Sequence, residues 1–231
     1  MANDYFKFRQ FTVQQGRCAM KVGTDGTLLG AWANGGHSVL DIGTGTGLIA
    51  LMMAQRFPDA HVIGIDIDTD AVGQARENVA ASPFRNIDII EADAKTFNVN
   101  CSTFNAIVCN PPYFVDSLES PDSQRTTARH ASFLPYHDLM ASAWRLLAGD
   151  GEFSVVIPFD YKSRLESEAT LRGFFKSREC AVKTTPRKLP RRYLMAFRKH
   201  PTALELTEGI IETMPGVRSP WYQELTNDFY L

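Results

Sequence analysis

The sequence predicts an α/β protein built on a mostly parallel sheet with helices on both faces. From residue 39 to residue 157, short apolar runs rich in Val and Ile alternate with longer stretches of helical periodicity. Such alternation is typical of parallel strands joined by crossover helices. Two of the apolar runs end in turns of unusual composition, one rich in glycine and one in proline. Because ligands of such sheets bind beyond the carboxyl ends of the strands, we expect the functional residues in these turns.

Length and composition indicate one folded domain. The chain has 231 residues, 44% hydrophobic and 22% charged, an ordinary balance for a globular protein. We expect a single domain over residues 1–231, with an N-terminal extension over 1–36 and a core over 37–231. The four cysteines form no Cys-x-x-Cys pair and have no His nearby, so neither a zinc site nor a disulfide framework is expected. No leader peptide or apolar membrane span is visible, which favours a cytoplasmic protein.

The first residues predict a β-hairpin. Apolar and polar residues alternate over residues 5–13, which indicates a strand. After a turn at residues 14–16, residues 18–21 are expected to pair back on that strand.

A polar segment precedes the first expected helix, which spans residues 27–33. The segment contains Lys21, Thr24 and Asp25. Asp25 or Thr27 is expected to cap the helix. The segment then has two interpretations: a capped turn, or a source of polar groups for a ligand above the sheet.

The glycine-rich turn follows the first strand of the core. After the apolar residues 39–42 come glycines at alternate positions, Gly43, Gly45 and Gly47, and then an apolar helix over 48–57. Glycines at such a turn let a ligand approach the backbone. The dinucleotide fingerprint Gly-x-Gly-x-x-Gly is broken by Leu48, and no P-loop Lys-Ser/Thr is present. The pattern suits an adenosine that carries an amino acid, whose ammonium group Asp41 would meet directly or through water.

The next two strands, expected over residues 61–67 and 87–90, are both followed by carboxylates. Asp66 lies 19 residues beyond Gly47, near the spacing at which a carboxylate accepts ribose hydroxyls. Asp68 is a competing candidate, but it is better placed to cap the following helix. After the third strand, Asp93, with Ala94 beside it, is a candidate partner for the adenine amine, or else an ordinary turn carboxylate.

The proline-rich turn, Asn110-Pro111-Pro112-Tyr113, follows an apolar strand over residues 104–109. Each proline fixes its own φ and disfavours helix at the residue before it, so the turn is stiff. The Asn110 side-chain oxygen and the Pro111 carbonyl can each accept one N–H of a planar amine, and Tyr113 can stack on the ring that carries it. The four residues are therefore candidate catalytic residues.

The second half of the chain shows further elements. We expect helices over 135–148 (ended by Gly149), from a capping box Ser163-x-x-Glu166 to about residue 171 (stopped by Gly173), and after Ser219-Pro220, with strands over 152–157, 180–184 and 193–198. Residues 204–211 fit either a strand or a helix. The long polar connection over 114–134 predicts a functional lid.

Positive charge is concentrated in one segment. Residues 161–200 carry 12 Lys or Arg but only 3 Asp or Glu, although the formal net charge of the chain is −2. Four of these cations lie in a proline-stiffened connection between the last two expected strands: Arg187, Lys188, Arg191 and Arg192. A basic surface on a slightly acidic protein indicates a polyanionic partner. The alternative is a solvated face of long side chains.

Several motifs together resemble the S-adenosylmethionine-dependent amino-methyltransferases of the Rossmann-like class. These are the glycine-rich turn at 41–47, Asp66, Asp93 and the turn at 110–113. Other pieces are similar, more narrowly, to the bacterial tRNA (adenine-N6)-methyltransferases that act on valine tRNA; these pieces are residues 6–11, 21–32, 110–114, 128–130 and 227–231.

This resemblance implies S-adenosylmethionine as cofactor and a seven-stranded, mostly parallel sheet whose last strand is antiparallel. It also implies methylation at N6 of the adenosine immediately 3′ of the anticodon. The implied partner is tRNA, with no membrane, no obligatory protein partner and a monomeric state. The residues expected to touch the RNA are Tyr113, Phe114, Arg125, Arg129 and His130. The four cations at 187–192 are expected to do so as well, but on the ground of their charge and not of the resemblance.

Three alternatives to RNA methylation can be weighed against the sequence. A protein glutamine N5-methyltransferase also uses Asn-Pro-Pro-Tyr, but members of that family carry an N-terminal helical domain, whereas the residues before the glycine-rich turn here look strand-like. A DNA adenine methyltransferase would add a recognition domain. The other alternative is an RNA-binding protein that retains a cofactor site but has lost transfer.

Overall fold

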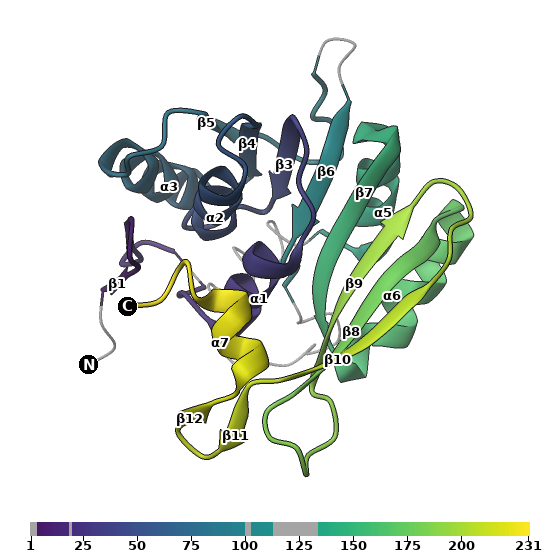
Figure 1. The fold of residues 1–231 in the computed structure, drawn as a ribbon. Coiled ribbons are helices and arrows are strands. Elements are labelled where there is room, and N and C mark those ends of the chain that lie inside the picture. The colour runs from purple at the N-terminus through teal and green to yellow at the C-terminus, as the bar shows by residue number, and fades with distance from the viewer. Residues whose placement is uncertain (1–3, 19, 100–102, 113–133) are drawn as a thin grey trace, which may run out of the picture.

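The chain folds around one eight-stranded sheet with helices on both faces (Figure 1). The computed structural model describes residues 4–18, 20–99, 103–112 and 134–231. From one edge of the sheet to the other, the strands are β10 (Glu205–Ile210), β8 (Phe175–Lys183), β9 (Arg192–Arg198), β7 (Leu147–Pro158), β6 (Phe104–Cys109), β3 (Ser38–Ile42), β4 (His61–Asp66) and β5 (Ile87–Glu91).

The directions of the strands confirm the expected topology and extend it. Strands β3, β4, β5, β6 and β7 are parallel to one another, and β9 runs antiparallel to both β7 and β8. This is the expected seven-stranded sheet. An eighth strand, β10, adds to the edge in parallel with β8. The segment that fitted either strand or helix is therefore a strand.

The helices cover the sheet in two layers, each with its own apolar core. On one face lie α1 (Thr24–Trp32), α2 (Leu48–Arg56), α3 (Thr69–Ala81) and α7 (Pro220–Thr226). On the other lie α5 (Tyr136–Leu146) and α6 (Phe159–Arg172). Successive strand residues point to opposite faces: Val39 packs in the first core and Leu40 in the second. Both faces are thus buried, as a parallel sheet requires.

The N-terminal hairpin differs from the expectation. It pairs β1 (Tyr5–Lys7) with β2 (Thr12–Gln14), so the turn lies inside the segment that was expected to be one strand. Its aromatic residues join the first core, where the C-terminal residues meet them: Arg9 N–H donates to the Phe229 carbonyl at 2.8 Å. Figure 1 shows the C-terminus beside β1. The two ends of the chain therefore pack as one unit.

Three helix boundaries were predicted wrongly. Helix α1 begins at Thr24 after the extended residue Gly23, so neither Asp25 nor Thr27 is its cap. Helix α6 begins directly after Pro158, which places the presumed capping box inside the helix. Helix α5 ends before Gly149, because β7 already begins at Leu147, where it pairs with β6. For α6 a proline, and for α5 the pairing of β7 with β6, set the boundary in place of the local capping pattern.

Other end signals are confirmed. The Asp68 carboxylate accepts the N–H groups of Asp70 and Ala71, as an N-cap does. Gly173 ends α6 in the left-handed region at φ 100°. Ser219 caps α7, with Pro220 as the first residue of that helix. A small hairpin, β11 (Glu212–Met214) with β12 (Val217–Arg218), precedes α7.

The carboxyl ends of the parallel strands form one edge of the sheet, which we call the carboxyl edge. The turns after β3, β4, β5, β6 and β7 lie there. Because β8 runs parallel to β7 and β9 returns antiparallel, the connection between β8 and β9 lies at this edge too. In the described part of the chain, no helix has the length and apolar character needed to cross a membrane.

Candidate active site at the carboxyl edge

The glycine-rich turn presents bare backbone to a cavity. Gly43, Gly45 and Gly47 have φ values of 69°, 54° and 79°, in the region that side chains disfavour. A Cβ atom at Gly43 or Gly45 would meet nothing within 4 Å, whereas one at Gly47 would lie 3.3 Å from Ala75. The first two glycines therefore keep space open for a ligand, and the third allows α2 to pack closely on α3.

A first cavity lies over the ends of β3, β4, β5 and β6. Its lining includes the predicted residues Gly43, Gly45, Asp66, Asp93, Ala94, Asn110, Pro111 and Pro112. The structure thus brings together residues from four turns that are far apart in the sequence.

Asp66 is held at the wall of this cavity. One carboxylate oxygen accepts the Gly45 N–H at 2.9 Å and the other accepts the Asp68 N–H at 3.0 Å. Burial raises the pKa of Asp66, and these backbone hydrogen bonds oppose the shift. Asp93 is fixed in a similar way, because one oxygen accepts the Lys95 N–H at 2.9 Å. Each carboxylate oxygen retains lone pairs that can accept a ligand hydroxyl or amine.

Asp41 lines neither this cavity nor the second one that adjoins it, so its contact with an ammonium group, directly or through water, stays a prediction. Its side chain is fully buried, and one oxygen accepts the Thr44 hydroxyl at 2.7 Å and the Ala50 N–H at 3.2 Å. Burial raises the pKa of Asp41 to about 7. Among the described contacts, its other oxygen has no hydrogen-bond partner. Asp41 therefore shapes the glycine-rich turn from inside the protein.

A second cavity adjoins the first and is closed by the N-terminal segment. The predicted residues Lys21, Thr24 and Asp25 line it, opposite the glycine-rich turn. Asn110 lines both cavities, and a Cβ atom at Gly26 would lie 3.9 Å from its side-chain nitrogen. Asn110 therefore marks the place where the two cavities meet. Of the remaining predicted residues, Tyr113, Phe114, Arg125, Arg129 and His130 lie outside the described ranges.

Arg192 belongs to the second cavity and not to the free basic connection. Its guanidinium donates to the Asp25 carboxylate at 2.5 Å, although the two residues are 167 positions apart. The pair joins the start of β9 to the first turn of α1. The positive charge of Arg192 is therefore neutralised by a carboxylate of the protein itself.

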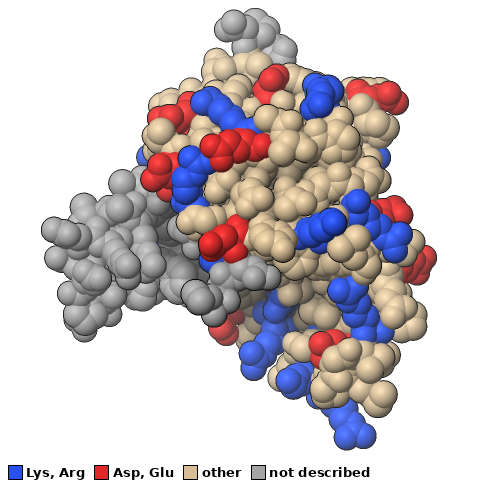
Figure 2. All heavy atoms as spheres, turned by 90° about the vertical axis from the view of Figure 1, so that its left-hand side faces the viewer, with Lys and Arg blue, Asp and Glu red and all other residues tan. Residues whose placement is uncertain are grey.

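The basic segment is more internally paired than its composition suggested. At least seven of its twelve cations contact carboxylates or backbone carbonyls of the fold: Lys162, Lys176, Arg178, Lys183, Arg192, Arg198 and Lys199. In contrast, Arg187, Lys188 and Arg191 are exposed in the connection between β8 and β9. Figure 2 shows Lys and Arg gathered at the lower end of the molecule, where Figure 1 places this connection.

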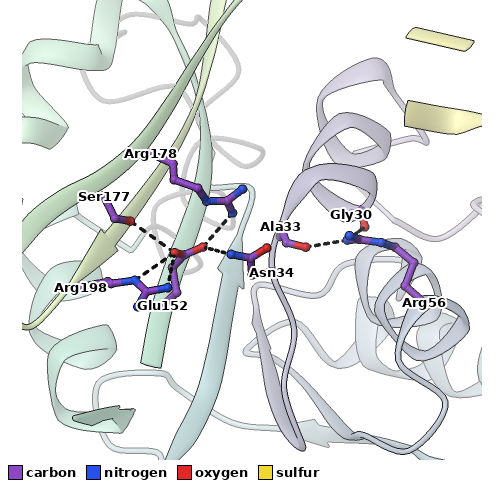
Figure 3. Close-up of polar contacts among 8 residues, drawn as sticks. All are labelled: Gly30, Ala33, Asn34, Arg56, Glu152, Ser177, Arg178 and Arg198. Carbon is purple, nitrogen blue, oxygen red and sulfur yellow. Dashed lines mark hydrogen bonds and ion pairs between the residues drawn. The ribbon is translucent and has the colours of Figure 1, made fainter. Parts of the chain in front are cut away.

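Helix α1, whose first turn lines the second cavity, is anchored at its other end (Figure 3). Arg56 donates to the carbonyls of Gly30 at 3.0 Å and Ala33 at 2.6 Å. Asn34 donates at 3.1 Å to Glu152, a buried carboxylate that also receives Arg178 at 2.7 Å and Arg198 at 3.2 Å. The Arg178 guanidinium lies 4.0 Å above the Trp32 ring. These contacts fix the position of the helix relative to the sheet.

Sequence reasoning missed much of the lining of the first cavity, including Cys18 and Met20. Neither residue type carries a ligand signal, and only their proximity to Lys21 pointed to the site. Burial raises the pKa of the Cys18 thiol to about 11, which favours the protonated form at neutral pH.

Comparisons with known proteins agree with this geometry. The methyltransferase small domain family matches residues 27–188. A tRNA1(Val) (adenine(37)-N6)-methyltransferase from Phocaeicola vulgatus is 48% identical over 100% of this chain and 99% of its own length, and the protein of the same name from Bacteroides thetaiotaomicron is 46% identical with the same coverage.

Among solved structures, a protein described as a predicted O-methyltransferase from Agrobacterium tumefaciens superposes with a TM-score of 0.66 at 19% identity. The match covers 89% of this chain and 96% of that one, and supports the fold. The open glycine-rich turn, with Asp66 and Asp93 at the neighbouring strand ends, fits the nucleoside of S-adenosylmethionine. The chain therefore belongs to the methyltransferase small-domain family and is an S-adenosylmethionine-dependent methyltransferase.

Proposed function

We propose that the protein methylates N6 of adenosine 37, immediately 3′ of the anticodon, in a valine tRNA. The observation that carries the proposal is the position of Asn110 where the two cavities meet. The names of the relatives, at 46–48% identity over the whole chain, support the same substrate.

The two cavities would divide the cofactor between them. In the first, Asp66 would accept the ribose hydroxyls, and Asp93 with Ala94 would meet the adenine. In the second, Lys21, Thr24 and the first turn of α1 would hold the amino-acid part, because Gly23 caps that helix without a side-chain hydrogen bond. When bound, S-adenosylmethionine supplies an electrophilic methyl group on a sulfonium sulfur.

Asn110 and Pro111 would orient the substrate. The Asn110 side-chain oxygen and the Pro111 carbonyl accept the two N–H groups of the adenine amine, so its lone pair points towards the cofactor cavity. Both acceptors stand at the end of a buried strand and are restrained by proline, so little reorganisation is needed. They also stabilise the positive charge that develops on the nitrogen during transfer.

The RNA contacts form the remaining part of the proposal. Tyr113 would stack on the target base, and a base in the anticodon loop is reached without opening a duplex. Arg187, Lys188 and Arg191 would neutralise phosphates from the carboxyl edge, where they are exposed. Arg192, which pairs with Asp25, would act on the cofactor side.

The test is to identify the methyl acceptor. Methyl-labelled cofactor is supplied with total tRNA, total protein and genomic DNA in parallel, and the labelled nucleoside or amino acid is identified. We expect label in 6-methyladenosine of tRNA, and its loss from a valine tRNA transcript in which adenosine 37 is replaced by guanosine. Label in protein glutamine would overturn the proposal.

A further inference from the structure

Phe159 exposes an aromatic ring at the carboxyl edge, close to the proposed transfer site. It is the first residue of α6, immediately after β7 ends, and 59% of the residue is accessible to solvent. Strand β7 is the direct neighbour of β6, whose end carries Asn110.

The register of these two strands places Phe159 relative to Asn110. Cys109 lies opposite Val155, so Phe159 is three residues further along the strand direction than Asn110. At a rise of about 3.3 Å per residue, this corresponds to roughly 10 Å, one strand to the side. Such a separation is comparable with the dimensions of a single nucleotide.

Phe159 contacts the connection between β8 and β9, which carries Arg187, Lys188 and Arg191. The Phe159 N–H donates to the Arg191 carbonyl at 3.0 Å. Its ring centroid lies 6.4 Å from that of Tyr193, and the Lys162 ammonium lies 4.5 Å from the centroid of the Tyr193 ring. Lys162 is itself held by Glu179 at 3.1 Å. An exposed ring is therefore supported from the side by an ordered cluster and stands between Asn110 and three exposed cations.

A single exposed apolar residue is ordinary on a protein surface. The location distinguishes Phe159 from Phe175, which is 43% exposed but begins β8, at the opposite edge of the sheet. Aromatic rings interleaved with cations are the arrangement that binds unpaired nucleotides, because every base offers a face for stacking.

We propose that Phe159 is a stacking platform for a nucleobase that flanks the target adenosine. The inference rests on the proposed function and adds a residue that positions the anticodon loop. By holding a neighbouring base, Phe159 would keep the loop open while the target base enters the site.

The test compares variants on chemically assembled valine tRNA. Phe159→Ala is expected to raise the KM for tRNA about 5- to 150-fold, the range that corresponds to 1–3 kcal/mol for one stacked base. The cofactor Kd should not change, and Phe159→Trp should restore the wild-type KM. Phe175→Ala is the matched control, with an aromatic ring removed from the other edge, and should behave as wild type.

Abasic substrates separate stacking from a general effect on structure. When the tRNA lacks the base at the position that Phe159 contacts, wild type and Phe159→Ala should have equal KM values. The platform would be overturned if Phe159→Ala raised the KM as much on both abasic tRNAs, one for each flanking position, as on intact tRNA. An unchanged KM for Phe159→Ala on intact tRNA would overturn it too. If the wild-type protein fails to methylate valine tRNA at all, the proposed function itself falls, and the platform with it, before any variant is compared.

Discussion

The two ends of helix α1 lie in contrasting surroundings. At its C-terminal end, Arg56 and Asn34 bind backbone and carboxylate groups that line neither of the two cavities described above. At its N-terminal end, Gly23 leaves the first turn without a side-chain cap, and Asp25 faces the second cavity in its pair with Arg192. The same helix is anchored at one end and available to a ligand at the other.

Two buried carboxylates of the sheet, Glu152 and Asp41, show the same contrast. Glu152 lies level with Val39 in the sheet, further from the carboxyl edge than Asp41, and receives hydrogen bonds from Asn34, Ser177, Arg178 and Arg198. Asp41, beside the glycine-rich turn, retains one oxygen without a described partner, and its pKa is raised to about 7. Both oxygens of Glu152 are therefore used in contacts that hold α1, β8 and β9 together, whereas Asp41, beside the carboxyl edge, is incompletely paired. Incompletely satisfied groups are expected where function competes with stability.

Among the proposed substitutions, we expect Glu152→Gln to cause the largest change in free energy. The substitution preserves shape but removes the buried counter-charge of Arg178 and Arg198, whose own side chains are partly exposed. Breaking a buried ion pair costs about 3–5 kcal/mol, so we expect a loss of this size in the free energy of unfolding. Chemical denaturation measures it, with Glu205→Gln on the exposed edge strand as control. If Glu152→Gln lowers the free energy of unfolding no more than the control does, the contacts around Glu152 do not stabilise the fold.

Asn110→Ala should lower the rate of methyl transfer without changing the stability of the fold. Loss of one preorganised group that stabilises developing charge lowers kcat about 100- to 1,000-fold. The cofactor Kd, measured by calorimetry, should stay close to wild type, because Asp66 and Asp93 remain in place. An equal loss of cofactor affinity in a folded variant would mean that Asn110 belongs to the cofactor site only.

Asp41→Asn tests the cost of the partly unpaired carboxylate. The folded protein keeps Asp41 protonated up to a pKa of about 7, whereas the unfolded chain loses that proton near the ordinary value of 3.8. The folded state therefore binds the extra proton between these values, and the stability of the wild type falls as pH rises from about 4 to 7. The variant should lack this loss, so its stability relative to wild type should improve by about 2 to 4 kcal/mol between pH 4 and pH 8. A difference independent of pH would show that Asp41 is ionised throughout.

We expect the smallest change in free energy when the exposed cations are replaced. Replacing Arg187, Lys188 and Arg191 together by Gln should weaken tRNA binding and reduce the salt dependence of the binding constant by a slope of about 0.7 for each lost phosphate contact. Arg172→Gln, an exposed cation at the far end of α6, serves as control. A slope equal to that of the wild type would leave the connection as solvated surface.

Local signals predicted much of the carboxyl edge. Proline and glycine restrict backbone angles residue by residue, so the turns at Gly43 and Asn110 were recognisable before any fold was known. The alternation of strands and helices then implied that these turns share one edge, which the structure confirms. Helix boundaries were less accessible, as the wrongly placed start of α6 shows, because a capping pattern inside a helix looks like one at its end.

The sequence by itself therefore determined the parallel sheet, the glycine-rich turn and the strand-end carboxylates, because these depend on periodicity and on backbone preferences of single residues. Only the tertiary structure decided that Arg192 pairs with Asp25, that Asp41 is sealed inside, that β10 extends the sheet and that Phe159 stands beside the basic connection. Each of these is a contact between segments distant in the chain. Such contacts depend on how elements pack, and no local pattern of residues encodes them.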